Sequence, residues 1–231
     1  MSQKSKTILT IIVIVFDIVL LISILCIRNA TMNNNLKKET RNLIALDFTK
    51  DRYNTKLKTS GSYGKVEDAM KDYLDEYAVL LQTVLKDIHD ERLTKVLSFD
   101  NYQKDGPEFK ESLEYLTSAK ETFNTNVDKL IADSSEANII KYGENRLNNK
   151  QLKLYKELML SNGMMKDFSD TQKTLQETKL RVNNLYDTST SVINFLIKNK
   201  DLWKLENGEI KFKNQTLYNE YTAMIKKLDT K

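Results

Sequence analysis

Proline, glycine, cysteine and histidine are all scarce in this sequence. It has 6 glycines and 1 proline among 231 residues, whereas average usage would give about 16 and about 11. These two residues form most tight turns and end many helices, so their scarcity argues against a fold of many short strands. What remains favours long helices with few connections.

The single cysteine and the single histidine limit the chemistry that is open to the chain. One cysteine, Cys26, permits neither an intrachain disulfide nor a metal site of several thiolates. His89 lies in the stretch DIHDER, but its acidic neighbours would lie on different faces of a helix, so we interpret it as part of a solvated helix end. Glycine-rich phosphate-binding motifs and nucleophile–base sets are also absent. We therefore predict that the protein is not an enzyme and has no catalytic, cofactor-binding or metal site.

An excess of charge of one sign is missing as well. The chain has 36 basic and 32 acidic residues, a net charge of +4, and the two signs are interspersed along its length. Such a surface produces no strong field, so we expect no nucleic acid among the partners. Charged residues are 29% and hydrophobic residues 40% of the chain, a composition typical of folded domains.

The longest apolar run covers residues 7–27, between Lys6 and Arg28. As a helix, its 21 residues would span about 31 Å, close to the roughly 30 Å hydrocarbon core of a bilayer. Sixteen of them are Ile, Leu, Val or Phe, and at roughly 0.3 to 0.6 kcal/mol each they outweigh the roughly 3 kcal/mol cost of one central aspartate. We predict a transmembrane helix over 7–27, a short basic tail over 1–6, and the lipid bilayer as a partner.

Asp17 lies at the middle of this predicted span. Ionisable residues inside a membrane usually face another helix or a water-filled cavity, so Asp17 is a candidate contact with a membrane-protein partner or with a second copy of the chain. Thr10 lies on the same helix face and could share this contact. The alternative is that Asp17 is protonated and tolerated within the lipid.

A cleaved signal peptide and a lipid anchor are the alternatives to a permanent helix. The apolar part of a signal peptide has about 7–15 residues and ends at a small-residue site, whereas this run is longer and its flank, ILCIRNAT, has no such site. Leu25 precedes Cys26, where a lipoprotein would have a small residue. Basic residues flank both ends of the run, but long domains translocate largely regardless of charge. We therefore expect an uncleaved signal anchor in the cell membrane, with the N-terminus cytoplasmic and the domain extracytoplasmic.

The rest of the chain has helical periodicity. Residues 28–61 have weak helical spacing and predict a juxtamembrane stalk, and TSGSYG at 59–64 marks the break before a domain over 62–231. Within this domain apolar residues recur at alternating steps of four and three, which is typical of amphipathic helices. The predicted helices cover 66–88, 91–97, 107–130, 137–142, 150–160, 169–196 and 215–228.

Two of these helix starts are predicted from capping signals. Gly106 is a candidate cap for a helix whose first residue is Pro107, because proline is favoured at that position. Ser169 and Gln172 form a capping-box pattern, which predicts a new helix after a break at 162–163.

One segment predicts strands. Residues 202–213 read LWKLENGEIKFK, with apolar residues alternating on either side of Asn207–Gly208. This pair is a strong signal for a two-residue hairpin turn of type I′. Trp203, Phe212 and the two apolar residues between them would share one face and cap the helices. Because apolar-striped helices bury their stripes best against one another, we predict an all-α fold, in which the transmembrane helix precedes an elongated antiparallel helical bundle with this one small hairpin.

Three segments of the predicted domain also carry a resemblance to known proteins. They are SYGKVEDAMKDYLDEY at 62–77, FDNYQKDGPEF at 99–109 and WKLENGEIKFKNQTL at 203–217. Their sequences resemble those of single-pass, membrane-anchored helical proteins of low-GC Gram-positive bacteria. The resemblance implies a bacterial cell-membrane protein with an extracytoplasmic domain. It includes no catalytic motif and assigns no functional residue.

These features predict a non-enzymatic interaction or scaffold protein of the cell envelope, whose partner is a membrane protein or a second copy of the chain. The alternative is a ligand-sensing or ligand-binding helical bundle that works with a membrane partner. The frequent tyrosines could line a ligand cleft, although rings at bundle margins with solvated hydroxyls are the simpler interpretation. A peptidoglycan-associated enzyme would need a cleft with convergent carboxylates, which we do not expect.

Overall fold

The computed structural model describes residue 23 and residues 28–47 and 56–229, and the chain forms two compact units. The first unit contains the residues up to Asp75 together with Ile139–Met165, and the second contains Glu76–Asn138 and the residues from Lys166 onward. In the described ranges, no helix has both the length and the apolar character that crossing a bilayer requires. The predicted tail over 1–6 and the predicted span over 7–27, Ser23 apart, lie outside the described residues.

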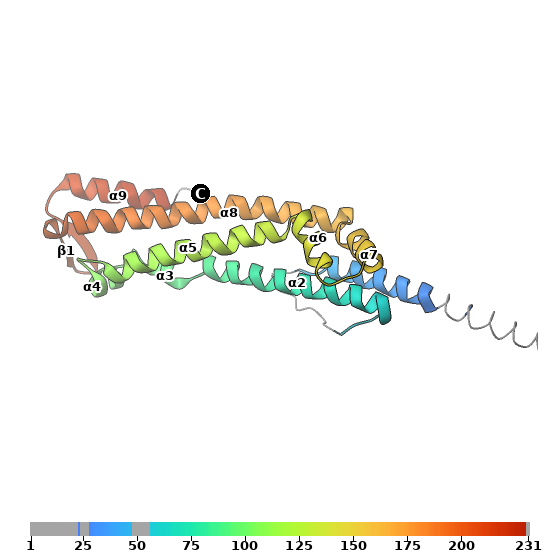
Figure 1. Cartoon of the computed structure of the whole chain (residues 1–231). Helices are drawn as coiled ribbons and strands as arrows, with labels where there is room; N and C mark the ends of the chain where they lie inside the picture. The colour runs from blue at the N-terminus through green and yellow to red at the C-terminus, as the bar shows by residue number, and fades with distance from the viewer. Residues whose placement is uncertain (1–22, 24–27, 48–55, 230–231) are drawn as a thin grey trace, which may run out of the picture. The chain divides into compact units, whose positions relative to one another are not determined.

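Helices account for most of the described chain, which confirms the predicted helical class (Figure 1). The first helix covers 28–44 and lies within the segment predicted as a stalk. The helices that follow it are α2 (Gly61–Ile88), α3 (Glu91–Lys95), α4 (Phe99–Asp105), α5 (Lys110–Asp133), α6 (Glu136–Glu144), α7 (Asn149–Met159), α8 (Asn162–Lys198) and α9 (Gln215–Asp229), with a 3₁₀ turn, η1 (Lys200–Leu202), after α8.

The first part of α2 is the central element of the first unit. Its apolar face, which includes Val66, Met70 and Leu74, is fully buried. The adjacent strip of the helix is buried as well, because Glu67 and Lys71 have almost no exposed surface. Apolar residues of the surrounding segments complete this core: Leu36 and Leu43 of the helix over 28–44, Ile139 of α6, and Tyr155 and Met159 of α7.

The second unit contains the antiparallel pair α5 and α8. Polar contacts at successive turns join the two helices: Lys120 to Asp187, Asn124 to Asn183, and Lys179 to Asp128. Pairing that moves forward along one helix and backward along the other defines an antiparallel arrangement of α5 and α8. Beneath these contacts lies an apolar core that includes Phe123, Val127, Leu130, Tyr186, Val192 and Leu196.

The predicted hairpin is confirmed. Strands β1 (Trp203–Glu206) and β2 (Glu209–Phe212) pair antiparallel, with Trp203 opposite Phe212. Asn207 and Gly208 both have positive φ, 54° and 80°, as a type I′ turn requires. The shared apolar face is half-buried, and the Trp203 indole N–H donates to the Leu196 carbonyl at 2.8 Å, which attaches the hairpin to the end of α8.

The predicted start of the helix at Pro107 is wrong. Gly106 lies at the C-terminal end of α4, where its N–H donates to the Tyr102 carbonyl, and α5 begins only at Lys110. The cap comes from Asp105, whose carboxylate accepts from the Ser112 N–H at 2.7 Å and the Glu111 N–H at 3.2 Å. A carboxylate from the preceding helix therefore satisfies two of the free N–H groups at the start of α5.

The predicted capping box at Ser169 is also wrong. Helix α8 begins at Asn162 and passes through Ser169 without interruption. Met164 and Phe168 are buried, so the apolar stripe already begins in this first part of the helix. Gln172 instead donates from its side-chain amide to the Ile131 carbonyl and the Ser134 hydroxyl at the end of α5. It satisfies a carbonyl of a neighbouring helix and does not cap its own.

Candidate functional site

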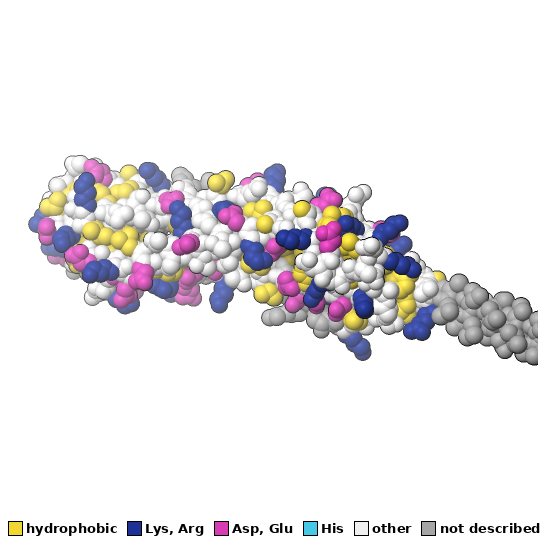
Figure 2. Space-filling view, viewed as in Figure 1, with side chains coloured by type: hydrophobic (Ala, Val, Ile, Leu, Met, Phe, Trp, Pro, Cys, Tyr) yellow, Lys and Arg dark blue, Asp and Glu magenta, His cyan; other side chains and the backbone are white. Residues whose placement is uncertain are grey.

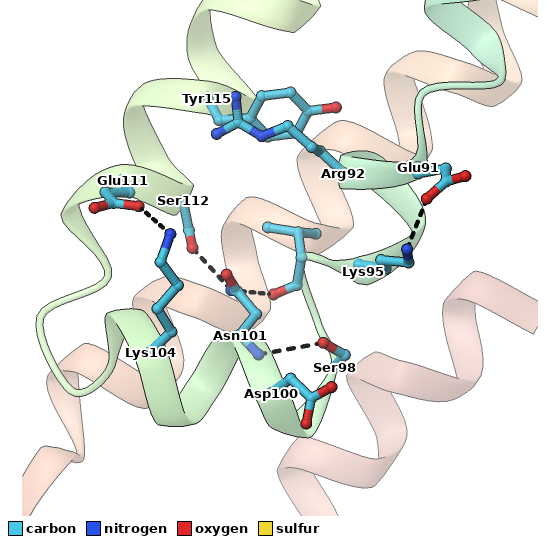
Figure 3. A pocket seen from close by; sticks show the side chains of 11 residues that line it. Glu91, Arg92, Lys95, Ser98, Asp100, Asn101, Lys104, Glu111, Ser112 and Tyr115 are labelled. Carbon is cyan, nitrogen blue, oxygen red and sulfur yellow. Dashed lines mark hydrogen bonds and ion pairs between the residues drawn. The ribbon is translucent and has the colours of Figure 1, made fainter.

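An open pocket of about 430 Å³ lies in the second unit and is the most developed candidate site (Figure 3). We call it the α3–α5 pocket, because its walls are α3, α4 and the first turns of α5. Two side-chain caps place the short helices around it. Asp90 accepts from the Arg92 N–H at the start of α3, and Ser98 accepts from the Asn101 N–H at the start of α4. The pocket is therefore formed by three successive helix starts.

The floor of the pocket is held by a chain of hydrogen bonds. The Asn101 side-chain amide donates to the Val96 carbonyl at 2.7 Å and to the Ser112 hydroxyl at 2.9 Å. The Ser112 hydroxyl in turn donates to the Asp105 carboxylate at 2.6 Å. Burial alone would raise the pKa of Asp105, but the hydrogen bonds from Ser112 and Glu111 outweigh burial and lower the pKa. Asp105 is therefore ionised at neutral pH and fixes the floor.

Two of the three cations of the pocket are paired with carboxylates. Lys95 lies 2.7 Å from Glu91, and Lys104 lies 2.9 Å from Glu111. The third cation is Arg92. Its guanidinium lies across the face of the Tyr115 ring, 4.2 Å from the ring centre, as Figure 3 shows. In the part of the chain that the structure describes, no carboxylate lies within ion-pair distance of this guanidinium.

Tyr115 is the support on which Arg92 rests. Its ring is mostly buried, and its hydroxyl donates to the Asp90 carboxylate at 2.8 Å. Burial in the first place, and the hydrogen bond to Asp90 in the second, raise the pKa of Tyr115, so its hydroxyl stays protonated and remains a donor. Since Asp90 also caps α3, one carboxylate holds both the ring and the helix that carries Arg92.

The residues singled out from the sequence have different outcomes. Asp17 and Thr10 lie outside the described residues. His89 is exposed at the end of α2, with Nδ1 2.7 Å from the Leu85 carbonyl. Over the described ranges, no group of three potential metal-binding side chains comes together. Asp90, the residue after His89, supports the α3–α5 pocket by holding Tyr115 and capping α3. Sequence spacing did not reveal this role.

A second charged cluster lies in the first unit. This Lys71 cluster consists of Lys71, Glu39 and Glu67. The Lys71 ammonium lies 2.8 Å from each of the two carboxylates and donates to the Lys56 carbonyl at 2.9 Å. Glu67 also accepts from the backbone of Lys58 and from the N–H and hydroxyl of Thr59. All three ammonium protons have acceptors, so the cluster joins segments of the fold and leaves the lysine no donor for a ligand.

Burial opposes the charges of the Lys71 cluster, and the contacts within it overcome burial. Desolvation would lower the pKa of Lys71, but hydrogen bonds to Glu39 and Glu67 raise it. Desolvation would raise the pKa of Glu67, but Lys71 and the donors of residues 58 and 59 lower it. Both groups are thus held in their charged forms at neutral pH.

Comparisons with known proteins add no assignment. No family model matches the chain, and neither a curated protein nor a solved structure matches it. Of the two charged groupings, the α3–α5 pocket is the one that is open to a ligand.

Proposed function

We propose that the chain is a membrane-anchored interaction or scaffold protein of the bacterial cell envelope, held by residues 7–27 with its helical domain outside the cell. The observation that carries the proposal is the packing of the helix over 28–44, which directly follows the apolar run. Leu36 is 1% exposed and Leu43 is 3% exposed. Glu39 on the same helix pairs with the buried Lys71. An anchor at 7–27 would therefore continue into a helix that is packed within the first unit.

Such an attachment suits a protein that presents a surface to a neighbour in the same membrane. A packed connection limits the orientations that the first unit can adopt relative to the anchor. This restriction raises the effective concentration of its binding surface for a protein anchored in the same membrane. Figure 2 shows basic and acidic side chains mixed over the visible face. This mixture favours a protein partner over a nucleic acid, which would need a surface of one sign.

The topology is tested by protease digestion of intact cells that carry an affinity tag after Lys231. We expect the external protease to remove the tag while a cytoplasmic marker protein stays intact. A tag that is cut only after the cells are lysed would contradict the extracytoplasmic domain. Recovery of a chain that begins after residue 28 in the aqueous fraction, without detergent, would contradict the anchor itself.

The partner is tested by crosslinking in membranes followed by affinity purification. We expect a crosslinked membrane protein or a dimer, and we propose that Asp17, assisted by Thr10, makes the contact within the bilayer. The variant Asp17→Leu should lose the crosslinked product, whereas Ser23→Ala, a change at another polar residue of the run, should keep it. Recovery of the monomer alone would count against the proposal.

A ligand-binding bundle is the second candidate, and the α3–α5 pocket favours it. The pocket is open, its floor is held by hydrogen bonds, and it contains a cation without a carboxylate partner among the residues described. A thermal-shift screen of the full chain in detergent against small metabolites would test it, because a ligand that binds the folded state raises the melting temperature.

A further inference from the structure

Arg92 lines the α3–α5 pocket in an arrangement that suits the binding of an anion. Its guanidinium is stacked on Tyr115, which Asp90 holds by a hydrogen bond. A guanidinium presents a planar fork of N–H donors that matches a carboxylate in bidentate geometry. Stacking on Tyr115 already restricts the Arg92 side chain. Arg92 would therefore lose less conformational entropy on binding a ligand than an unrestrained arginine would.

The other charges of the pocket select a singly charged ligand. Lys95 and Lys104 are each paired with a glutamate, so the positive charge that they offer to a second negative group is already partly neutralised. Asp100 also lines the pocket and adds a further negative charge. A phosphate or sulfate dianion would therefore meet one arginine and several carboxylates, whereas a carboxylate ligand needs only the one arginine.

Whereas Arg92 supplies hydrogen-bond donors, Asn101 supplies a hydrogen-bond acceptor. Its amide N–H₂ group donates to the Val96 carbonyl and to the Ser112 hydroxyl. A backbone carbonyl can only accept, so this contact defines which side of the amide is the nitrogen. Among the residues that the structure describes, no donor pairs with the amide oxygen of Asn101, which lines the pocket and lies between Ser98 and Ser112 in Figure 3. A ligand with an N–H group near its carboxylate would use both Arg92 and Asn101.

We propose that the α3–α5 pocket binds a carboxylate with a neighbouring N–H group, that is, a free amino acid or the C-terminal end of a peptide, and that Arg92 recognises the carboxylate. The volume of about 430 Å³ lies in the range of about 300–1,000 Å³ that is usual for small-ligand sites. This inference does not depend on the membrane anchor. It identifies the ligand of the second candidate function, and it stands or falls separately from the topology tested above.

The test follows the Nε–H resonances of the arginine side chains in the full chain, purified in detergent at low salt, by nuclear magnetic resonance. The Arg92 resonance is identified by its loss in Arg92→Lys. Glycylglycine is the first probe, and its C-terminal amide is the matched compound without a carboxylate. We expect glycylglycine to shift the Arg92 resonance in a saturable way, and we expect the amide and inorganic phosphate at equal concentrations to have no such effect.

Two pairs of variants test the roles of the residues by calorimetric titration with glycylglycine. Arg92→Gln should weaken binding by about ten-fold or more, the loss that follows from one charge-assisted contact. Arg181→Gln, a change at an exposed arginine of α8 outside the pocket, should leave the affinity unchanged. Tyr115→Leu should weaken binding because Arg92 loses its support, while Tyr115→Phe, which keeps the ring, should weaken it less. Circular dichroism checks that each variant keeps its helices.

Further probes separate the two sources of the carboxylate. Binding of glycine that equals or exceeds that of triglycine would identify a free amino acid, whereas tighter binding of triglycine would identify a peptide end. The proposal is overturned if glycylglycine leaves the Arg92 resonance unchanged, if the amide or phosphate shifts it as strongly, or if Arg92→Gln binds as well as Arg181→Gln.

Discussion

Lys71 is the cation shared by two carboxylates in the first unit. It is 3% exposed, and its ammonium lies between Glu39 and Glu67. Removing one member of a buried ionic group leaves the other charges without compensation, which costs more than the group contributed as a whole. The cluster therefore makes the local structure depend on one residue.

The variant Lys71→Met tests this dependence. We expect it to lower the free energy of unfolding by about 3–5 kcal/mol, because two buried carboxylates lose their shared cation. Chemical denaturation of the full chain in detergent, followed by circular dichroism, measures the change. Lys86→Met, at an exposed lysine of the same helix, is the control and should change stability by less than about 0.5 kcal/mol. Equal stability of the two variants would contradict the role of the cluster.

Gly143 is a position where only glycine fits. It follows the helix predicted over 137–142 and lies within the last turn of α6, against Tyr155. A Cβ added there would lie 2.7 Å from two atoms of the Tyr155 ring. That ring is fully buried, so a shift of the ring would disturb its neighbours in the core.

The variants Gly143→Ala and Gly163→Ala form a matched pair within the first unit. We expect Gly143→Ala to destabilise by about 1–3 kcal/mol through overpacking. Gly163 lies in the first turn of α8, and no described atom beyond its chain neighbours and the backbone of its own helix lies within 4 Å of an added Cβ. Its replacement should therefore be neutral or stabilising by up to about 1 kcal/mol. Thermal unfolding by circular dichroism compares the two variants, and a smaller loss at Gly143 than at Gly163 would contradict the packing argument.

At the scale of elements, the α5–α8 pair is held in register by polar contacts as well as by its apolar core. Asn124 and Asn183 exchange two hydrogen bonds, each of 2.9 Å, between their side-chain amides. Ion pairs lie one turn away on each side. A shift of one helix along the other would break these contacts together, so they specify one alignment of the pair.

The variant Asn183→Ala measures this contribution. Asn124 would then lose its partner in a partly buried site, so we expect destabilisation by about 1–2 kcal/mol. Asn184→Ala changes an exposed neighbour on the same helix and should stay within about 0.5 kcal/mol of the parent protein. Denaturation midpoints of both variants provide the measurement, and indistinguishable midpoints would exclude a role for the amide pair in stability.

Apolar periodicity was sufficient to predict some of the helices but not the start of every helix. The predicted helices over 66–88, 150–160 and 215–228 match α2, α7 and α9 closely, because an apolar stripe is a local pattern. The starts of α5 and α8 were missed, and α4 has no counterpart among the predicted helices. The Ser169 pattern predicted a helix start, but the apolar stripe of α8 already begins at Met164 and Phe168. Burial of these two side chains favours a helix that continues through Ser169.

At the scale of the whole molecule, the buried ions make stability depend on pH in a defined way. The pKa of Glu67 is lowered from its ordinary value of 4.5, so its contribution is complete above pH 4.5 and is lost as the pH falls through the lowered value. The pKa of Lys71 is raised from 10.5, so its contribution is complete below pH 10.5 and is lost as the pH rises through the raised value. Between these limits the cluster gives a constant contribution.

Comparison of the parent protein with Glu67→Gln tests this pH dependence. We expect the parent to melt at a higher temperature at neutral pH, because the neutral amide pairs less strongly with Lys71. The difference should shrink below about pH 4.5, where Glu67 becomes protonated in the unfolded chain and then in the folded one. Melting temperatures recorded across the acid range measure it, and a difference that stays constant through this range would contradict the lowered pKa.

The sequence by itself determined the helical class, most helix positions and the hairpin at Asn207–Gly208. These features depend on neighbours a few residues apart, where apolar periodicity and turn chemistry act directly. It also supplies the predicted anchor over 7–27, which stays a prediction. Only the tertiary structure decided that Lys71 is buried between two glutamates and that Arg92 rests on Tyr115 beside an open pocket. Glu67 lies one helix turn from Lys71, but Glu39 and the Tyr115 ring lie much farther along the chain from their partners. Packing brings such distant residues together, and a local sequence pattern does not record it.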